Sequence, residues 1–415
     1  MRAMSQLRKD ADIIINEAIQ AVLPDAAVKK ALADEEFPGS VYLVSVGKAA
    51  WQMAKSAAEV MQDRLSGGIV VTKYGHVKHP LDKIACYEAG HPVPDENSFS
   101  ATRKVLDYVE KLKETDTVLF LLSGGGSALF EMPLIPGGEL QNITRQLLAC
   151  GADIVQINTI RKRLSAVKGG RFAQACYPAK VYSVVLSDII GDSLDMIASG
   201  PAYPDSSTCG QAMEIVNKYD LKLSEQALAC LQQETPKVCP NVTTRITGSV
   251  WELCMAAAES CRRLGYEPQI LTDSLDCEAK DAGRELAFVL QKHRGTKTPL
   301  AFIAGGETVV TLTGNGKGGR NQELALSAAP ILADLPGAAL FSIGSDGTDG
   351  PTDAAGGYVD SSTQNILQQQ GVDIHQVLQN NDAYRALQKC NGLIITGPTG
   401  TNVNDVAVAL LLPEQ

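Results

Sequence analysis

Short apolar runs alternate with segments of helical periodicity along most of the chain. The clearest run is Val118–Leu122, five apolar residues that lead directly into a turn with three consecutive glycines. An unbroken apolar run of this length is typical of a strand buried on both faces of a parallel sheet. The other predicted strands are Gly39–Ser45, Gly68–Thr72, Val181–Leu186, Gln269–Leu271, Leu300–Ala304, Val309–Thr313, Ala338–Ile343 and Leu393–Thr396. Because predicted helices separate most of these runs, the pattern indicates an α/β fold.

Apolar residues at helical spacing mark the expected helices. A helix is predicted at Ala11–Val22, a long one at Leu140–Val155 and a closing one at Val406–Leu411. The chain has 415 residues, which is too long for one ordinary core, so two domains are expected. A proline-containing stretch with little pattern, Thr235–Thr244, suggests a boundary there. The sequence therefore predicts domains of residues 1–240 and 241–415.

The triple-glycine turn is the strongest candidate for a ligand site. It reads Ser123-Gly124-Gly125-Gly126-Ser127 between a predicted strand and a predicted helix that Ser127 could cap. Glycines allow positive φ and let backbone N–H groups approach a ligand closely. A strand, a glycine turn and a helix N-terminus together can hold a phosphate group. The alternative is a tight turn with no ligand.

Two cations stand beside similar turns. Lys48 follows the strand Gly39–Ser45, at the edge where α/β proteins bind ligands, although a solvated surface lysine is the alternative. Arg320 follows the glycine-rich segment Gly314–Gly319 at the predicted start of a helix, where its charge would suit a phosphate. A third turn, Gly397–Thr401, precedes the predicted closing helix.

Carboxylates and further basic residues complete the candidate chemistry. Asp188 and Asp192 follow the strand Val181–Leu186, where they could contact a hydroxyl or cap a helix. Three aspartates lie in one glycine-rich loop and are candidate Mg²⁺ ligands, with a solvated loop as the alternative: Asp346, Asp349 and Asp353. The basic segment Asn158–Arg171 would place Arg161, Ser165 and Lys168 on one helix face.

Composition excludes several classes of protein. The net charge is −10 with no basic block, which argues against nucleic acid as the main partner. No apolar run approaches the roughly 20 residues that a membrane span needs. The first residues lack the apolar core of a signal peptide, and ten scattered cysteines contain no Cys-x-x-Cys pair. A cytoplasmic protein without a zinc site is expected, and a homodimer is compatible with a sequence that does not determine the oligomeric state.

These features together favour phosphoryl transfer. That reaction needs donors around the phosphates, cations for the transition-state charge and a metal ion that bridges oxygens. The glycine turns, Lys48, Arg320 and the aspartate loop supply such groups, whereas the five histidines lie near no nucleophile motif. Because these features occur in both halves of the chain, the active site is expected in a cleft between the domains.

The motifs also resemble a known family, the class II glycerate 2-kinases. The resemblance extends over residues 41–411, and the C-terminal part is similar to that family's MOFRL domain. It rests on motifs in one order: Leu122–Leu129, Asn158–Arg171, Ser187-Asp188, Ala198–Pro201, Gly305–Thr308, Gly318–Glu323, Ser345–Asp353 and Gly397–Asp405. Many relatives have His in place of Arg163 and an acidic pair in place of Asp192-Ser193.

The resemblance implies a Rossmann-like N-terminal domain, an α/β MOFRL-type domain and the reaction of ATP with D-glycerate, with Mg²⁺, to give 2-phosphoglycerate. By motif, it implies that Lys48 and Arg320 are critical and hold the substrate carboxylate or the transferring phosphoryl group. Asp188 or Asp192 would orient the 2-hydroxyl or accept its proton. The phosphates would bind Ser123–Ser127 and the loop residues Gly397, Thr399, Gly400 and Thr401. The remaining substrate-binding candidates are Asn158, Arg161, Lys168 and Glu307.

Two other functions stay open. Relatives have been labelled hydroxypyruvate reductases, but that reaction needs a nicotinamide site and the Gly-x-Gly-x-x-Gly fingerprint is absent. A non-catalytic protein that binds a phosphorylated metabolite is the second alternative, and it predicts binding without turnover. Residue chemistry alone does not distinguish 2-phosphorylation from 3-phosphorylation.

Overall fold

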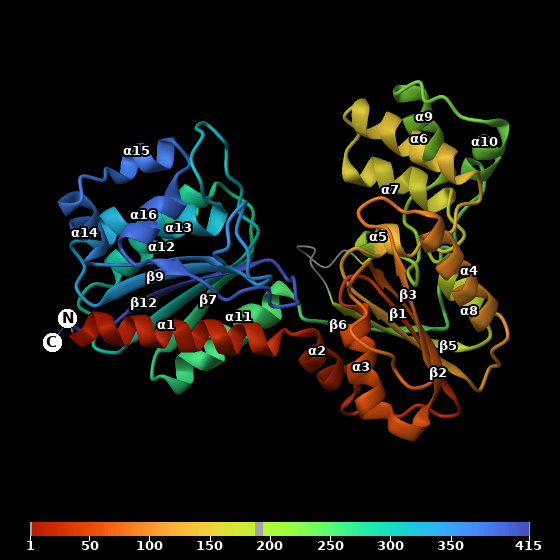
Figure 1. The fold of residues 1–415 in the computed structure, drawn as a ribbon, viewed down its shortest axis with the longest axis horizontal. Helices are drawn as coiled ribbons and strands as arrows, with labels where there is room; N and C mark the ends of the chain where they lie inside the picture. The colour runs from red at the N-terminus through yellow and green to blue at the C-terminus, as the bar shows by residue number, and fades with distance from the viewer. Residues whose placement is uncertain (1, 187–193, 415) are drawn as a thin grey trace. The chain divides into compact units, whose positions relative to one another are not determined.

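The computed structural model describes residues 2–186 and 194–414, and these residues form two compact units. One contains residues 27–186 and 194–247, and we name it the parallel-sheet unit. The other contains residues 2–26 and 248–414, and we name it the mixed-sheet unit. Figure 1 shows the course of the chain through each unit. The predicted boundary near residue 240 lies close to this change of unit, whereas the N-terminal residues pack with the C-terminal part of the chain.

Six parallel strands form the sheet of the parallel-sheet unit, in the order β3-β2-β1-β4-β5-β6. All six residues of β4 are buried, as the apolar run predicted. Successive strands are added outward on either side of the central pair β1 and β4. The direction of strand order therefore reverses between these two. The bounds are β1 (Val41–Val46), β2 (Leu65–Lys73), β3 (Ile84–Ala89), β4 (Thr117–Leu122), β5 (Lys180–Leu186) and β6 (Val242–Thr247).

Helices cover this sheet on both faces. The right-handed crossovers from β1 to β2 and from β3 to β4 run in opposite directions along the sheet, and so place α3 and α4 on opposite faces. Helix α8 packs on β5 and contacts α4. The helices and turns in and next to this part of the unit are α2 (Pro24–Leu32), α3 (Ala50–Met61), η1 (Gln62–Arg64), α4 (Glu96–Val109), α5 (Gly126–Leu129), α8 (Arg171–Cys176) and η2 (Ile197–Ser199).

A helical layer with its own core belongs to the same unit. Its helices are α6 (Gly137–Ala149), α7 (Ile154–Arg163), α9 (Cys209–Lys218) and α10 (Glu225–Leu231). They bury apolar side chains such as Leu147, Ile160 and Leu231 against one another. The single helix predicted over 140–155 is wrong, because Gly151 has a φ of 74° and the Asp153 side chain accepts the Gln156 N–H to start α7.

The mixed-sheet unit has a six-stranded sheet of order β11-β10-β9-β12-β8-β7. Only β7 and β8 pair in parallel, and the other pairs are antiparallel. Helices α1 and α11 contact each other and the sheet, while α12 and α13 pack together and contact β9, β10 and β12 (Figure 1). The strands are β7 (Glu267–Leu275), β8 (Leu300–Gly306), β9 (Ala338–Gly344), β10 (Gly356–Asp360), β11 (Leu393–Ile394) and β12 (Asp405–Leu411), and the helices are α1 (Arg2–Ala21), α11 (Val250–Arg263), α12 (Ala279–Lys292), α13 (Arg320–Leu332), α14 (Thr363–Gln369), α15 (Ile374–Gln379) and α16 (Ala383–Lys389).

The last segment of this unit differs from the prediction. The closing helix expected at Val406–Leu411 is wrong, because these residues lie in β12, a central strand that pairs with both β8 and β9 and is buried throughout. A short apolar run fits a buried strand as well as a helix, and periodicity does not separate the two. The strand expected at Val309–Thr313 is reduced to one bridge between Glu278 and Val309.

The edge strand β6 was also missed by the prediction. It overlaps the expected linker, and all of its residues except the last are partly or fully exposed, so no apolar run marks it. Among the described residues, no helix is both long and apolar enough to cross a bilayer.

Candidate active site

Lys48 and the triple-glycine turn lie at the same edge of the parallel sheet. Lys48 follows β1 and the turn follows β4, and these two strands are adjacent and parallel. Strand order reverses between them, and ligands of open α/β sheets bind at such a switch point, outside the carboxyl ends of the strands. The fold therefore brings together the two features that the sequence singled out in this half of the chain.

Backbone contacts join the two turns directly. The Lys48 N–H donates to the Gly124 carbonyl at 2.9 Å, and the Ala49 N–H donates to Ser123 Oγ at 3.1 Å. Ser123 is 2% exposed, and its hydroxyl also donates to the Val46 carbonyl at 3.4 Å. The Ser123 side chain thus holds the turns together, so its hydroxyl is not free to bind a phosphate.

The glycine turn is tighter than predicted. Gly125 has a φ of 89°, in the left-handed region that favours glycine, and it caps the short helix α5. The prediction that Ser127 is the N-cap is wrong, because Ser127 lies inside the helix. Since α5 spans only Gly126–Leu129, its dipole is too small to carry the anion-binding argument by itself.

Lys48 itself is partly exposed, and its ammonium group has no ion pair or hydrogen bond within the part of the chain that the structure describes. Its carbonyl oxygen lies 2.8 Å from Nδ1 of His76. The His91 ring lies close by, next to Gly125. A cation without a carboxylate partner, at the mouth of a glycine turn, is well placed to meet an anionic ligand.

Arg161 and Lys168 lie behind the turn and not in its mouth. Both donate to the Ser127 carbonyl, at 2.8 and 3.0 Å, and Lys168 also donates to the Phe130 carbonyl at 3.1 Å. The fully buried carboxylate of Glu131 lies 3.5 Å from Arg161 and 3.6 Å from Lys168. Burial lowers the pKa of Lys168 to about 8, although the charge of Glu131 opposes that shift.

These contacts change the expected role of the basic segment. Lys168 is completely buried, so its ammonium group supports the backbone below the glycine turn and is not free for a substrate. The predicted shared helix face is wrong, because α7 ends at Arg163. Arg161 and Lys168 meet all the same, because Lys168 returns to the Ser127 carbonyl from beyond the end of the helix.

Asn158 holds a strained loop next to this cluster. Its side-chain oxygen accepts a hydrogen bond from Ser199 Oγ at 2.9 Å, and its side chain is buried. Ala198 and Ser199 have φ values of 50° and 61°, which non-glycine residues rarely adopt. Such strain is concentrated at functional sites. The Ala198 carbonyl also accepts a hydrogen bond from Lys168 at 3.5 Å, so the basic cluster connects this loop to the glycine turn.

In the mixed-sheet unit, Arg320 is the first residue of α13 and is held by two carboxylates. Its Nε and Nη2 donate to Asp405 at 2.6 and 3.1 Å, and Nη1 lies 3.0 Å from Glu307. Burial by itself lowers the pKa of Arg320, but the hydrogen bonds and charge of Asp405 outweigh burial and raise this pKa. The guanidinium group is therefore charged and oriented before any ligand binds.

The N-terminus of α13 is already occupied by a carboxylate of the protein. Asp349 accepts the N–H groups of Asn321 and Gln322 at 3.2 and 2.9 Å. Burial raises the pKa of Asp349 to about 7. The expectation that this helix N-terminus adds to a phosphate site is therefore not supported, and only the Arg320 side chain remains a candidate.

The three aspartates of the predicted Mg²⁺ site do different things. Asp349 caps α13, the carboxylate of Asp346 accepts the Thr348 N–H at 2.9 Å, and the exposed Asp353 accepts from the Tyr384 hydroxyl at 2.8 Å. Within residues 2–186 and 194–414, no three acidic, histidine or cysteine side chains come together as a metal site. These residues do not fit a resident metal ion.

The segment Gly397–Thr401 packs against the same aspartate loop. Thr399 Oγ1 donates to the Ser345 carbonyl at 2.6 Å, and Thr401 Oγ1 donates to the Val22 carbonyl at 2.9 Å. The two threonine hydroxyls are thus engaged with the protein, and the segment leads into β12 and not into a helix. Asp188 and Asp192, the candidates for contact with the acceptor hydroxyl, lie outside the described residues.

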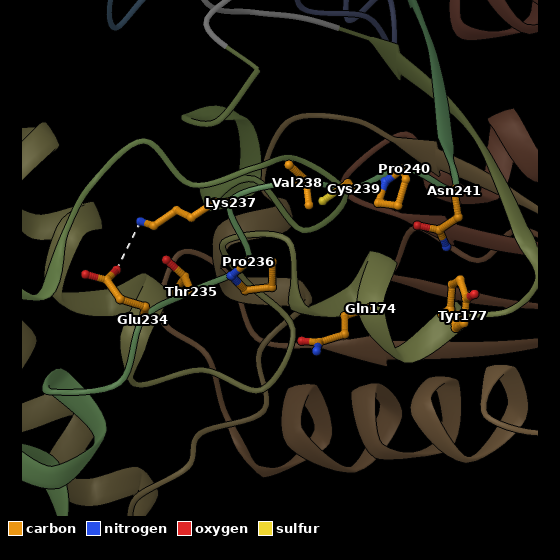
Figure 2. Close-up of a pocket in the computed structure, with 10 residues that line it drawn as sticks. All are labelled: Gln174, Tyr177, Glu234, Thr235, Pro236, Lys237, Val238, Cys239, Pro240 and Asn241. Carbon is orange, nitrogen blue, oxygen red and sulfur yellow. Dashed lines mark ion pairs between the residues drawn. The ribbon is translucent and has the colours of Figure 1, made fainter.

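One open hollow lies in a different part of the parallel-sheet unit. It has a volume of about 510 Å³. Lys237 Nζ lies 3.0 Å from Glu234 Oε2, and Figure 2 marks this ion pair along the wall of the hollow. Its lining residues are Gln174, Tyr177, Glu234, Thr235, Pro236, Lys237, Val238, Cys239, Pro240 and Asn241. None of the predicted site residues lines it, so we do not assign the catalytic chemistry to this hollow.

Sequence reasoning assigned no role to three residues that lie against the candidate site residues. Glu131 balances the buried cations, Asp405 orients Arg320, and His91 lies beside Gly125. His91 stands in the segment Gly90–Asp95 that its prolines make rigid, and Asp405 ends the family motif Gly397–Asp405, whereas Glu131 carried no such signal. Glu131 and Asp405 come close to their partners only through tertiary contacts.

Comparisons with known proteins agree with this architecture. Residues 10–232 match a domain of unknown function, DUF4147, and residues 300–405 match the MOFRL family. The chain is 53% identical to a D-glycerate 2-kinase from Thermotoga maritima over 98% of this chain and 99% of that protein. It is 40% identical to a glycerate 2-kinase from Pyrococcus horikoshii over 96% of each chain.

A solved structure shares the fold. The crystal structure of a glycerate kinase from Thermotoga maritima superposes with a TM-score of 0.94 at 52% identity, and covers 98% of this chain and 100% of that chain. The expected α/β fold, with a Rossmann-like first unit and a MOFRL-type second unit, is confirmed. Because both family matches occur in order and the relatives align over nearly the whole chain, the chain belongs to the family of glycerate kinases with a C-terminal MOFRL domain.

Proposed function

We propose that this protein is a glycerate 2-kinase, which transfers the terminal phosphoryl group of ATP to the 2-hydroxyl of D-glycerate. The observation that carries the proposal is the 53% identity, over nearly the full length of both chains, to a protein named D-glycerate 2-kinase. Lys48 and Arg320, the two residues that the family motif marks as critical, are both present. Arg320 is the first residue of α13, and Lys48 lies in the short turn between β1 and α3.

The two cations would stabilise the charge that develops during transfer. Lys48 stands beside the glycine turn, where backbone N–H groups can bind the nucleotide phosphates. The Arg320 guanidinium group, held by Asp405, offers planar donors that match a carboxylate or a phosphoryl group. The Gly397–Thr401 segment contributes backbone groups to the same chemistry in this proposal.

Mg²⁺ enters the proposal as part of the substrate. Kinases of many folds use the ion bound to the nucleotide phosphates, where it neutralises charge on the transferring group. The aspartate loop does not form a ligand set by itself. We therefore assign no step to a protein-bound metal, and expect the ion to arrive with ATP.

A coupled assay tests both the reaction and its regiochemistry. The protein is supplied with D-glycerate, ATP and Mg²⁺, and enolase is added without phosphoglycerate mutase. Phosphoenolpyruvate is the expected product, because enolase acts on 2-phosphoglycerate directly. Release of ADP without phosphoenolpyruvate would contradict 2-phosphorylation and indicate a 3-kinase or ATP hydrolysis.

The same preparation tests the reductase alternative. NADH and hydroxypyruvate are supplied in place of ATP and glycerate, and absorbance at the nicotinamide band is followed. No oxidation of NADH is expected. In support, the segment after β1 reads Val46-Gly47-Lys48 and lacks the spaced glycines of a dinucleotide fingerprint.

A further inference from the structure

His91 occupies a position in the site that no role yet explains. A Cβ atom built on Gly125 would lie 3.1 Å from both Cδ2 and Nε2 of His91, and 3.1 Å from Cγ of Lys48. The edge of the imidazole ring and the stem of the lysine therefore converge on the same glycine. Gly125 is the residue whose left-handed conformation makes the turn. The ring thus borders the mouth of the glycine turn from the side of β3.

The segment that carries His91 is anchored in several places. The Gly90 N–H donates to Asp95 Oδ1 at 3.1 Å, and the same oxygen accepts the Ser98 N–H at 2.9 Å to cap α4. The Tyr74 hydroxyl donates to the other carboxylate oxygen of Asp95 at 2.6 Å. A side chain on an anchored segment is held ready for a ligand, and this preorganisation is what catalytic groups require.

The imidazole ring is free to react. Neither ring nitrogen has a hydrogen-bond partner among the residues that the structure describes. Burial lowers the pKa of His91, and the positive charges of Lys48, Lys73 and His76 lower it further. These three residues come from the β1–α3 turn, the end of β2 and the loop after β2. The lowered pKa favours the neutral ring, in which one nitrogen can accept a proton.

We propose that His91 is a catalytic residue that contacts the acceptor hydroxyl and takes its proton during phosphoryl transfer. The inference rests on the proposed kinase function. The hydroxyl proton moves to a ring nitrogen, and the hydroxyl oxygen forms a bond to the terminal phosphorus atom. The bond between that phosphorus and the bridging oxygen breaks, and ADP leaves with the electron pair. His91 then returns the proton to solvent.

This assignment competes with Asp188 and Asp192 for the role of base. The nearby ammonium group of Lys48 makes His91 a weaker base, because an imidazolium formed next to an ammonium is unfavourable. Phosphoryl transfer through a loose transition state needs only partial proton removal, so a weak base is sufficient. A positioned general base typically contributes about 10²- to 10⁴-fold to the rate, and we place His91 at the lower end of that range.

Two variants of His91 and one control test the proposal. His91→Gln keeps a polar side chain but cannot act as a base, and we expect kcat to fall by about 10²-fold while KM for ATP stays unchanged. The acid limb of the wild-type kcat profile should disappear in this variant. His79→Gln is the matched control, because His79 is exposed and its ring lies next to its own chain at Pro80.

His91→Ala provides a readout that does not depend on the first variant. Truncation leaves space for free imidazole. Added imidazole should restore a large part of kcat to His91→Ala and should leave the kcat of the His79→Gln control unchanged. Wild-type kcat in folded His91→Gln, an unchanged acid limb, or no rescue of His91→Ala by imidazole would each overturn the proposal. Failure of the kinase function itself would appear differently, as no 2-phosphoglycerate from the wild-type protein.

Discussion

Each unit carries one of the two cations proposed for the active site, and the surroundings of these two cations differ. Lys48 stands beside a glycine turn with no carboxylate paired to its ammonium group in the described part of the chain. Arg320 forms ion pairs with Asp405 through Nε and with Glu307 through Nη1. A flexible lysine can follow a moving charge, whereas a held guanidinium fork presents donors in one orientation. In the proposed mechanism, Lys48 would therefore act through its charge, and Arg320 through its charge and its fixed orientation.

Substitutions that keep the charge should separate these two requirements most strongly. Arg320→Ala is expected to lower kcat by about 10³-fold or more, on the scale of losing a transition-state arginine. Arg320→Lys should be nearly as damaging, because an ammonium group cannot bond both oxygens of Asp405 and still face a ligand. Lys48→Arg should keep much more activity than Lys48→Ala. Steady-state kinetics with the coupled assay measures all four variants.

The proposed difference between Lys48 and Arg320 would be contradicted if Arg320→Lys retained most of the wild-type kcat. Arg320 would then act through charge alone, like Lys48. Circular dichroism and the thermal midpoint serve as controls that each variant is folded. Near-wild-type turnover of folded Arg320→Ala would remove this residue from the mechanism altogether.

The next prediction concerns the buried support of the glycine turn. Lys168→Met leaves the Glu131 carboxylate buried with only Arg161 at 3.5 Å, so we expect the free energy of unfolding to fall by about 3–5 kcal/mol. Lys162→Met is the matched control, because Lys162 is also buried and pairs with Asp205 at 3.1 Å. Both variants should lose stability, as measured by urea unfolding.

Only one of the two should lose function beyond its loss of stability. Lys168 bonds the Ser127 carbonyl and Lys162 does not, so KM for ATP should rise about tenfold in folded Lys168→Met alone. Equal kinetics in the two folded variants would show that the Lys168 cluster stabilises the fold without positioning the turn. This experiment extends the comparison between the two units. In the mixed-sheet unit, Asp405 bonds Arg320 itself. In the parallel-sheet unit, the buried Lys168 bonds the glycine turn beside Lys48.

Local patterns predicted the arrangement around Lys48 in the parallel-sheet unit, whereas long-range contacts decided the surroundings of Arg320 in the mixed-sheet unit. The strand, turn and cation around Lys48 are short-range features, so the sequence revealed them. The cap of α13 by Asp349 and the grip on Arg320 by Asp405 join residues far apart in the chain. No spacing rule predicts such pairs. Residues 406–411 show the same limit, since only the neighbours β8 and β9 decide that this apolar run is a strand.

Substitution of Glu307 has the smallest expected effect on the kinetics, and it tests directly which contacts hold Arg320. Its carboxylate is 47% exposed and lies 3.0 Å from Arg320 Nη1, where an anionic substrate would bind in the proposed mechanism. If the two anions compete, Glu307→Gln frees the outer face of the guanidinium group. An exposed ion pair is worth about 0.2–1 kcal/mol, so KM for D-glycerate should fall by about 1.4- to 5-fold with kcat unchanged.

An increase of KM for D-glycerate in Glu307→Gln would assign Glu307 a different role. If its carboxylate accepts a hydrogen bond from a substrate hydroxyl, as the family resemblance implies, Glu307→Gln should raise KM for D-glycerate. Asp405→Asn separates the inner contact from the outer one, because Asp405 is nearly buried and holds Nε and Nη2, the donors that set the orientation of the fork. A lower KM in Glu307→Gln would show that Glu307 competes with the substrate for Arg320. A lower kcat in Asp405→Asn would show that Asp405 orients the guanidinium group.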